Sequence, residues 1–318
     1  MFRSDPITFH VPASAANLGP GYGMLGVALD LPLHVTIEPR TDGTILIERR
    51  DAPLMTAEDR RHDPVLRGLR VGAEKFGVSL QKGVALVIDG TIPRGTGLGT
   101  ISAGFAAGLG AAARLSQKPW TAGEALDALV PMGGDPAHGA ASLLGGCVAT
   151  VPIGFEKGSV HRHQVLPMPI HGNWQFVVMM PDVAIGTADT KRVLPPTIPH
   201  GVASRTAGRV VGILHALAHG DEELLAACMR DETHVPYRRS LYSGIDDTLR
   251  SAVEAGACGA TICGHGPSLM AMTTDEGKTK ALARAMVESQ KRFGRRATSL
   301  VLQVAHYGAL PLHQEARR

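Results

Sequence analysis

The pattern of apolar and polar positions divides the first half of the chain into short strands and helices. Strand-like alternation or short apolar runs occur at residues 7–10, 33–39, 44–49, 84–88 and 147–151. Helical spacing of apolar residues occurs at residues 64–76, 100–115 and 122–130, and a turn-rich segment follows at residues 133–139. The segment 100–115 is rich in alanine and glycine and almost uncharged, which predicts a buried helix.

The second half of the chain also contains both strand-like and helical patterns. Strand-like runs occur at residues 164–168, 175–180, 260–263, 269–273 and 299–304. Helical patterns lie around residues 210–217, 222–229, 245–255 and 276–293. The last third reads helix, strand, strand, helix, strand, the order of a split βαβ unit. Since no low-complexity linker separates the halves, we expect an α+β protein with two packed domains, residues 1–153 and 154–318.

Composition narrows the possible functions without choosing one. The chain has 318 residues, 44% of them hydrophobic, and a net charge of only +3. Weak, scattered charge argues against nucleic acid or a membrane as partner. The first residues lack the apolar core of a signal peptide, so a cytoplasmic location is expected. Four cysteines without C-x-x-C spacing predict core thiols rather than metal ligands.

The glycine-rich sequence PRGTGLGTISA at residues 93–103 is the clearest chemical motif. It follows a strand and opens the buried helix, and helix N-termini offer free N–H groups to phosphate. It is not a Walker A motif, because no Lys-Ser/Thr pair follows the glycines. Backbone N–H groups, two hydroxyls and a bound Mg²⁺ would supply the positive charge instead. The predicted cofactor-binding residues here are Pro93, Gly95, Gly97, Leu98, Gly99, Thr100, Ile101 and Ser102.

Two further glycine-rich segments support a phosphate-binding function over a simple turn. One is PASAANLGPGY at residues 12–22, and the other is GHGPS at residues 264–268. In this order the three motifs resemble those of the galactokinase, homoserine kinase, mevalonate kinase and phosphomevalonate kinase (GHMP) superfamily, with the homoserine kinases as the nearest match. Further similar stretches are residues 143–146, 194–195, 234–241 and 255–257.

The resemblance implies a fold, ligands and partners. It implies a ribosomal-protein-S5-like N-terminal domain, a ferredoxin-like C-terminal domain, and ATP with Mg²⁺ between them. The third motif would approach the same cleft, with Gly264 and Gly266 allowing close backbone contact. A homodimer, a hydroxy amino acid as substrate and a role in threonine biosynthesis are implied as well. A Cβ at Gly97 or Gly99 is expected to obstruct the phosphate and abolish nucleotide binding without unfolding the protein.

Several polar residues match positions at which the superfamily binds substrate. Arg238 is expected to pair with the substrate carboxylate, which its planar guanidinium can hold through two hydrogen bonds. Lys191 or Arg192 stands where the family carries a basic residue. Asn17, in the first motif, stands where the family uses an asparagine near substrate and nucleotide. The expected catalytic residues are Asn17, Thr100, His138 and Arg238.

Three departures from the family pattern fall on the expected reaction centre. Gly23 stands where homoserine kinases usually have an aspartate beside the substrate. Thr100-Ile101 replaces two serines, so one hydroxyl is kept. The stretch PMGGDPAH at residues 131–138 lacks the glutamate that binds magnesium in the family. Asp135 is the nearest carboxylate, which makes Thr100 and Asp135 the candidate metal ligands.

These departures leave three hypotheses. The first is an ATP-dependent kinase that phosphorylates the hydroxyl of homoserine or a related hydroxy amino acid. The second is a diverged enzyme that carries out transfer, elimination or cyclisation, with His138 as a candidate acid or base. The third is a non-catalytic protein that binds a nucleotide or metabolite.

Overall fold

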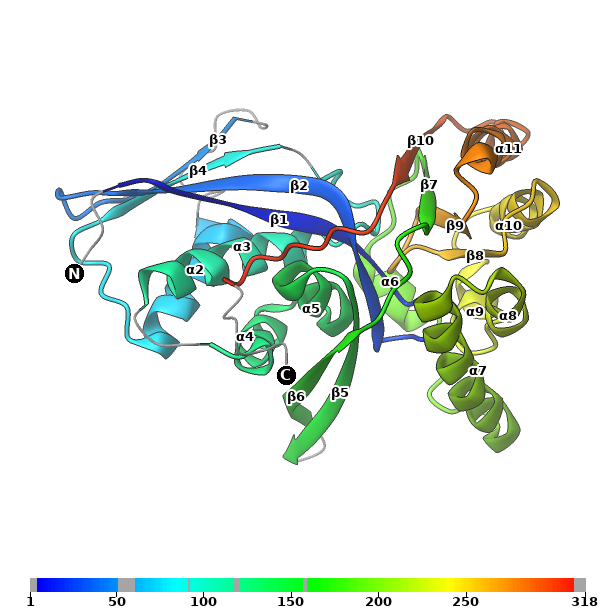
Figure 1. Ribbon diagram of the computed structural model, residues 1–318, viewed down its shortest axis with the longest axis horizontal. Coiled ribbons are helices and arrows are strands. Elements are labelled where there is room, and N and C mark those ends of the chain that lie inside the picture. Colours follow the sequence, from blue (N-terminus) through cyan, green and yellow to red (C-terminus); the bar gives the residue numbers. More distant parts are fainter. Residues whose placement is uncertain (1–4, 51–60, 91, 117–119, 157–158, 312–318) are drawn as a thin grey trace.

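Two β-sheets, each covered by helices, make up the protein (Figure 1). The computed structural model describes residues 5–50, 61–90, 92–116, 120–156 and 159–311. Among the described helices, none is both long and apolar enough to cross a membrane. The expected α+β class is confirmed.

The first sheet has six strands in the order β3-β4-β2-β5-β6, with β1 paired to β2. Its strands are β1 (Ile7–Ala16), β2 (Leu25–Pro39), β3 (Ile45–Arg49), β4 (Val84–Asp89), β5 (Cys147–Glu156) and β6 (Ser159–Met168). Neighbouring strands are antiparallel except β3 and β4. Both β1 and β2 extend beyond the predicted runs, because their small or apolar ends are buried and show no polar alternation.

Four helices cover this sheet on one side: α2 (Pro64–Phe76), α3 (Thr100–Leu115), α4 (Ala122–Leu129) and α5 (Pro136–Leu144). The predicted bounds of α2 and α3 are confirmed. The two helices pack with almost no space between them, since a Cβ on Gly108 would lie 2.0 Å from the carbonyl oxygen of Val65. This close contact explains why α3 consists mainly of alanine and glycine.

The second sheet has the order β10-β7-β9-β8 and is antiparallel. Its strands are β7 (Gln175–Pro181), β8 (Gly259–Ile262), β9 (Leu269–Thr273) and β10 (Ala297–Leu302). Helices α10 (Ile245–Glu254) and α11 (Thr279–Lys291) share a core with Val177 and Met179. The alternate residues Phe176 and Val178 belong to the larger core, together with residues of α7 (His200–His219) and α8 (Glu222–Cys228). The predicted order helix, strand, strand, helix, strand is confirmed.

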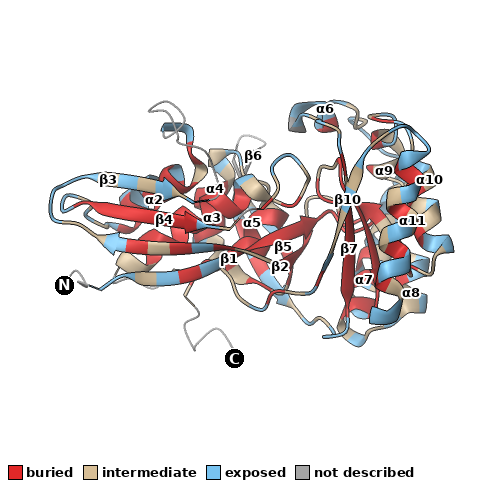
Figure 2. Ribbon diagram, turned by 90° about the horizontal axis from the view of Figure 1, so that it is seen from above, coloured by how far each residue is buried: buried red, intermediate tan, exposed pale blue. Residues whose placement is uncertain are grey.

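The two halves are joined by more than one connection. The boundary expected after residue 153 falls inside β5, whose pairing with β6 keeps the chain in the first sheet as far as Met168. After β10 the chain returns along the first half, where Gly146 N–H donates to Ala305 O at 2.7 Å and Ala309 N–H donates to Ser142 O at 2.9 Å. Figure 2 shows β2 and β7 mostly buried, as expected where two layers share one core.

Candidate active site

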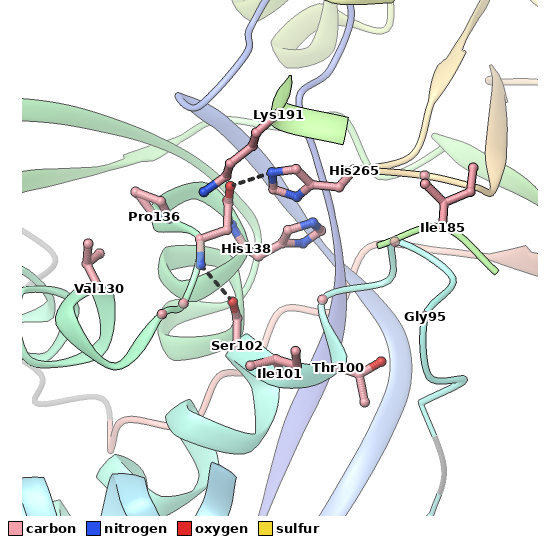
Figure 3. A pocket seen from close by; sticks show the side chains of 16 residues that line it. Gly95, Thr100, Ile101, Ser102, Val130, Pro136, His138, Ile185, Lys191 and His265 are labelled. Atoms are coloured by element: carbon pink, nitrogen blue, oxygen red, sulfur yellow. Dashed lines mark hydrogen bonds and ion pairs between the residues drawn. The ribbon is translucent and has the colours of Figure 1, made fainter. Parts of the chain in front are cut away.

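A cavity of about 330 Å³ lies where the glycine-rich loops of the two halves meet (Figure 3). The first turn of α3 lines it from one side and the start of α5 from another. The loop at residues 265–266 and Lys191 of α6 (Thr187–Arg192) contribute from the second half. Residues far apart in the sequence therefore surround one space.

The N-terminus of α3 opens into this cavity without a side-chain cap. Gly99 is its N-cap residue, with a left-handed φ of +73°, and no described side chain bonds to the first N–H groups. By contrast, α2, α4 and α5 are capped by Asp63, Thr121 and Asp135. The free N–H groups and the helix dipole make this end of α3 suited to bind an anion.

All three glycine-rich motifs are held together by backbone contacts. Ser14 N–H donates to Leu98 O at 3.1 Å, and Gly264 N–H donates to Ala16 O at 3.0 Å. A Cβ on Gly97 would lie 2.2 Å from Cys263 O and 3.0 Å from Gly266 O. A side chain at this position would meet the third motif rather than a phosphate. A substitution at Gly97 is therefore expected to disturb nucleotide binding by separating the two loops, not by obstructing the phosphate directly.

Gly99 is constrained by its neighbours in the same way. A Cβ there would lie 2.3 Å from Ser14 Oγ and 2.8 Å from His138 Nδ1. By contrast, Gly95 lines the cavity and has a φ of +71°, and a Cβ built on it meets nothing within 4 Å. Of these three glycines, Gly95 is therefore the one whose missing side chain leaves open space.

Asn17 ties the first motif to the third. Its Nδ2 donates to Gly264 O at 2.8 Å, and its Oδ1 accepts from Gly23 N–H at 2.7 Å. The residue is buried and has a φ of +61°, a conformation that asparagine tolerates better than most residues. Gly23 has a φ of +71°, and a Cβ on it would meet nothing within 4 Å. The amide of Asn17 thus positions both loops.

Arg238, at the end of α9 (Val235–Arg238), is fully buried rather than on the surface. Its Nη1 donates to Gly264 O at 3.1 Å, its Nε donates to Thr190 O at 3.3 Å, and the guanidinium lies 5.0 Å from the ring centre of Tyr22. Its Nη2 is buried with no hydrogen-bond partner among the described residues. A buried unpartnered donor costs free energy, and an anionic ligand would satisfy it.

His138 is a buried histidine in the first turn of α5. Its Nδ1 lies 2.9 Å from Ser14 Oγ, and its backbone N–H donates to Asp135 Oδ1 at 3.0 Å. Burial lowers the pKa of His138, although Asp135 acts in the opposite direction. The imidazole is therefore neutral at pH 7.

His265 is a cavity residue that the sequence motifs did not single out. Its Nε2 lies 3.8 Å from Asp135 Oδ2, and its ring centre lies 6.4 Å from that of His138. Burial lowers the pKa of His265 to about 4, with Asp135 opposing the shift. The signal available in the sequence was its position, an ionisable side chain between the two glycines of the third motif.

The two hydroxyls expected beside the phosphates make different contacts. Thr100 Oγ1 donates to Pro93 O at 2.8 Å, so its proton is engaged and only a lone pair is available to a ligand. Ser102 Oγ accepts from Asp135 N–H at 3.2 Å. Within the described residues, no cluster of three His, Cys, Asp or Glu side chains could hold a metal ion.

The remaining candidates are distributed between the cavity and its surroundings. Lys191 and Ile101 line the cavity, and the side chain of Ile101 is exposed. Leu98 is fully buried, so only its backbone is available to a ligand. Arg192 is exposed, forms an ion pair with Asp189 at 3.2 Å, and is not among the residues that line the cavity.

Acid is expected to destabilise the folded protein. Burial lowers the pKa values of His138, His234 and His265, so all three bind protons more readily in the unfolded chain. Their contribution to the free energy of unfolding is fully present above pH 6.5. It falls below that pH by up to about 1.4 kcal/mol per pH unit for each histidine.

Urea unfolding at several pH values between 7.5 and 5 measures this effect. His234→Asn should reduce the slope, whereas His219→Ala, a change at the exposed end of α7, should leave it unchanged. A free energy of unfolding that is constant over this range would contradict the prediction.

An α+β protein that directs free helix N–H groups into a cavity lined by both of its halves has the features of a phosphate-binding protein. Two family models match the chain. The model for the GHMP kinases N terminal domain covers residues 64–146, and the model for GHMP kinases C terminal covers residues 213–291.

Similar proteins cover nearly the whole chain. The homoserine kinase of Synechocystis sp. is 31% identical over 304 residues, 95% of this chain and 97% of its own length. That of Thermosynechococcus vestitus is 31% identical over 94% of this chain and 96% of its own. The solved structure of a homoserine kinase from Cytophaga hutchinsonii has a TM-score of 0.82 and 26% identity, covering 97% of this chain and 98% of that one. L. major mevalonate kinase, at 14% identity and a TM-score of 0.69, shares the fold.

The chain belongs to the GHMP kinase family. The expected fold and the expected enzyme class, a phosphotransferase with an alcohol acceptor, are confirmed. ATP is the phosphoryl donor of this family, and a small molecule is its acceptor. The Mg²⁺ ion, the homodimer, the cytoplasmic location and the individual site residues stay predictions.

Proposed function

We propose that this protein transfers the γ-phosphoryl group of ATP to the side-chain hydroxyl of homoserine. The observation that carries the proposal is the uncapped N-terminus of α3, which faces the cavity. Arg238 is not among the residues that line this cavity, but it bonds to Gly264 O, directly before the lining residues 265 and 266, and its Nη2 is a free donor. The relatives that match the chain over nearly its full length are homoserine kinases, which supports this acceptor over other alcohols.

Different residues of the site would bind the phosphates of ATP and the carboxylate of homoserine. The N–H groups of residues 100–102 would bind the phosphates of ATP, and Lys191 adds a positive charge on the opposite side of the cavity. Arg238 Nη2 would bind the homoserine carboxylate, while Asn17 holds the two loops around it. The acceptor oxygen then forms a bond to the γ-phosphorus as the bond to ADP breaks, and the hydroxyl proton passes to a phosphoryl oxygen or water.

The residues present fit a magnesium ion that the nucleotide brings with it. Such an ion needs one or two carboxylates in addition to phosphates and water. Asp135 Oδ1 already accepts a backbone hydrogen bond, while Oδ2 has only the 3.8 Å approach of His265. Asp135, with Ser102 and a lone pair of Thr100, would therefore hold Mg²⁺. When bound, the ion neutralises charge on the β- and γ-phosphates.

The function is tested by ADP release from ATP and Mg²⁺ with and without homoserine, followed by phosphorus NMR. We expect homoserine-dependent ADP together with a new phosphomonoester. Folded protein that binds ATP but forms neither product would refute the proposal. Product formed without ADP would show a different reaction, and ADP formed equally without acceptor would show an ATPase.

A further inference from the structure

His265 lines the cavity, yet the proposed mechanism has so far given it no role. Its glycine neighbours have φ values of +57° and +81°, so the backbone turns sharply on both sides of the imidazole. Its side chain is only 13% exposed and lines the cavity (Figure 3). The ring is therefore mostly shielded from solvent and faces the cavity.

The loop that carries His265 is fastened on two sides. Toward the second motif, Ser268 N–H donates to Thr96 O at 3.3 Å. Toward the first motif and α9, Gly264 O accepts hydrogen bonds from Asn17 and Arg238. A side chain on a loop anchored in this way is pre-organised for contact with a ligand, because little freedom remains to be lost on binding.

The ring of His265 has a free hydrogen-bonding capacity. Its approach to Asp135 Oδ2, at 3.8 Å, is too long for a hydrogen bond. Among the residues that the structure describes, no other group bonds to its ring nitrogens. An imidazole ring carries at least one N–H donor whether it is neutral or protonated, so His265 has a donor to offer to a ligand.

The charges around the cavity indicate what this donor would meet. The N-terminus of α3 attracts phosphate, and Asp135, which would hold the magnesium ion of the nucleotide, lines the same cavity. A terminal phosphoryl group bound there carries oxygens that hydrogen-bond donors on the cavity wall can bind. His265 and Lys191 both line the cavity and supply such donors.

We propose that His265 is a catalytic residue that donates a ring N–H to an oxygen of the γ-phosphoryl group of ATP. This inference rests on the proposed kinase function and adds a residue to it. The hydrogen bond persists while the phosphorus moves from the ADP oxygen to the acceptor oxygen, and the imidazole itself gains and loses no proton. Its contribution is to hold the transferred group in line and to stabilise its charge.

The contact is tested by comparing two ligands that differ at the γ-phosphate. Calorimetric titration with ADP and with AMP-PNP, a non-hydrolysable ATP analogue, is carried out in Mg²⁺ for wild type and His265→Ala. We expect the variant to bind AMP-PNP about 10- to 100-fold more weakly and to bind ADP as wild type does, because only the γ-phosphate has lost a donor. The kcat should fall with little change in KM for the acceptor.

Two amide variants of His265 test for partial rescue of binding, and a variant of a distant histidine is the control. His265→Gln and His265→Asn place an amide N–H near the positions of Nε2 and Nδ1, so one of them should recover part of the AMP-PNP affinity. They also carry the test if the alanine variant does not fold. His219→Ala, on the exposed end of α7, should behave as wild type.

Three results would overturn the inference: unchanged AMP-PNP affinity, equal loss of ADP and AMP-PNP affinity, or a change confined to KM for the acceptor. The binding experiment uses no acceptor. If AMP-PNP binding depends on His265 but homoserine is not phosphorylated, only the proposed acceptor is refuted. If homoserine is phosphorylated but AMP-PNP binding does not depend on His265, only the role of His265 is refuted.

Discussion

Gly97→Ala is expected to abolish ATP binding and to destabilise the fold at the same time. The new Cβ would lie 2.2 Å from Cys263 O, a backbone atom that cannot turn away, and alanine is strained at a φ of +84°. Relief requires the second motif to separate from the third, which would shift the N-terminus of α3 relative to the cavity. We expect ATP affinity to fall by at least about 100-fold and the melting temperature to fall by on the order of 5 °C.

Gly77→Ala is the matched control for backbone strain. Gly77 ends α2 with a φ of +67°, and a Cβ there meets nothing within 4 Å. This variant should lose some stability and keep its ATP affinity, as measured by thermal unfolding and calorimetry. If Gly97→Ala bound ATP as tightly as Gly77→Ala does, the contact between the two loops would not position the phosphate site.

Arg238→Ala is expected to raise the KM for homoserine about 100-fold while ATP affinity changes little. The guanidinium is fully buried, and its Nη2 is the donor without a described partner that a carboxylate would satisfy. Loss of a charge-assisted hydrogen bond of this kind costs about 1.5–3 kcal/mol. Gly264 O would keep its hydrogen bond from Asn17, so the third motif should stay in place.

The neighbouring arginine provides the control for Arg238. Arg239 is exposed and lies 3.5 Å from Asp246, so Arg239→Ala should leave both KM values unchanged. Initial rates at varied homoserine and varied ATP separate the two effects. If Arg238→Ala weakened ATP binding as much as homoserine binding, Arg238 would be a support for the loop at residues 264–266 and not a ligand for the carboxylate.

Secondary structure was predicted well wherever the signal was local. The bounds of α2 and α3 agree with the sequence prediction, because a helical apolar stripe and an Ala/Gly-rich run are complete within their own segments. Strand ends were harder to place. The first part of β2, before residue 33, is buried without regular alternation, so its pairing with β1 and β5 is not visible in the pattern.

In the candidate site, too, local features could be predicted from the sequence and contacts between distant segments could not. The sequence identified the phosphate loop, because a glycine run between a strand and a helix has a local physical meaning. It gave no means of knowing that Arg238 is buried against Gly264, or that a Cβ on Gly97 would meet Cys263, 166 residues away in sequence. His265 gained significance only from the ring's position beside Asp135.

The sequence by itself determined the class of fold, most helices and strands, and the three glycine-rich loops, two of which line the cavity. Periodicity and glycine conformation act over a few residues and can therefore be read from the chain. Only the tertiary structure decided which atoms of those loops touch, which cation is buried and which side chains are left free to bind. Those properties depend on packing between distant segments, and burial and electrostatic interaction arise only once that packing is complete.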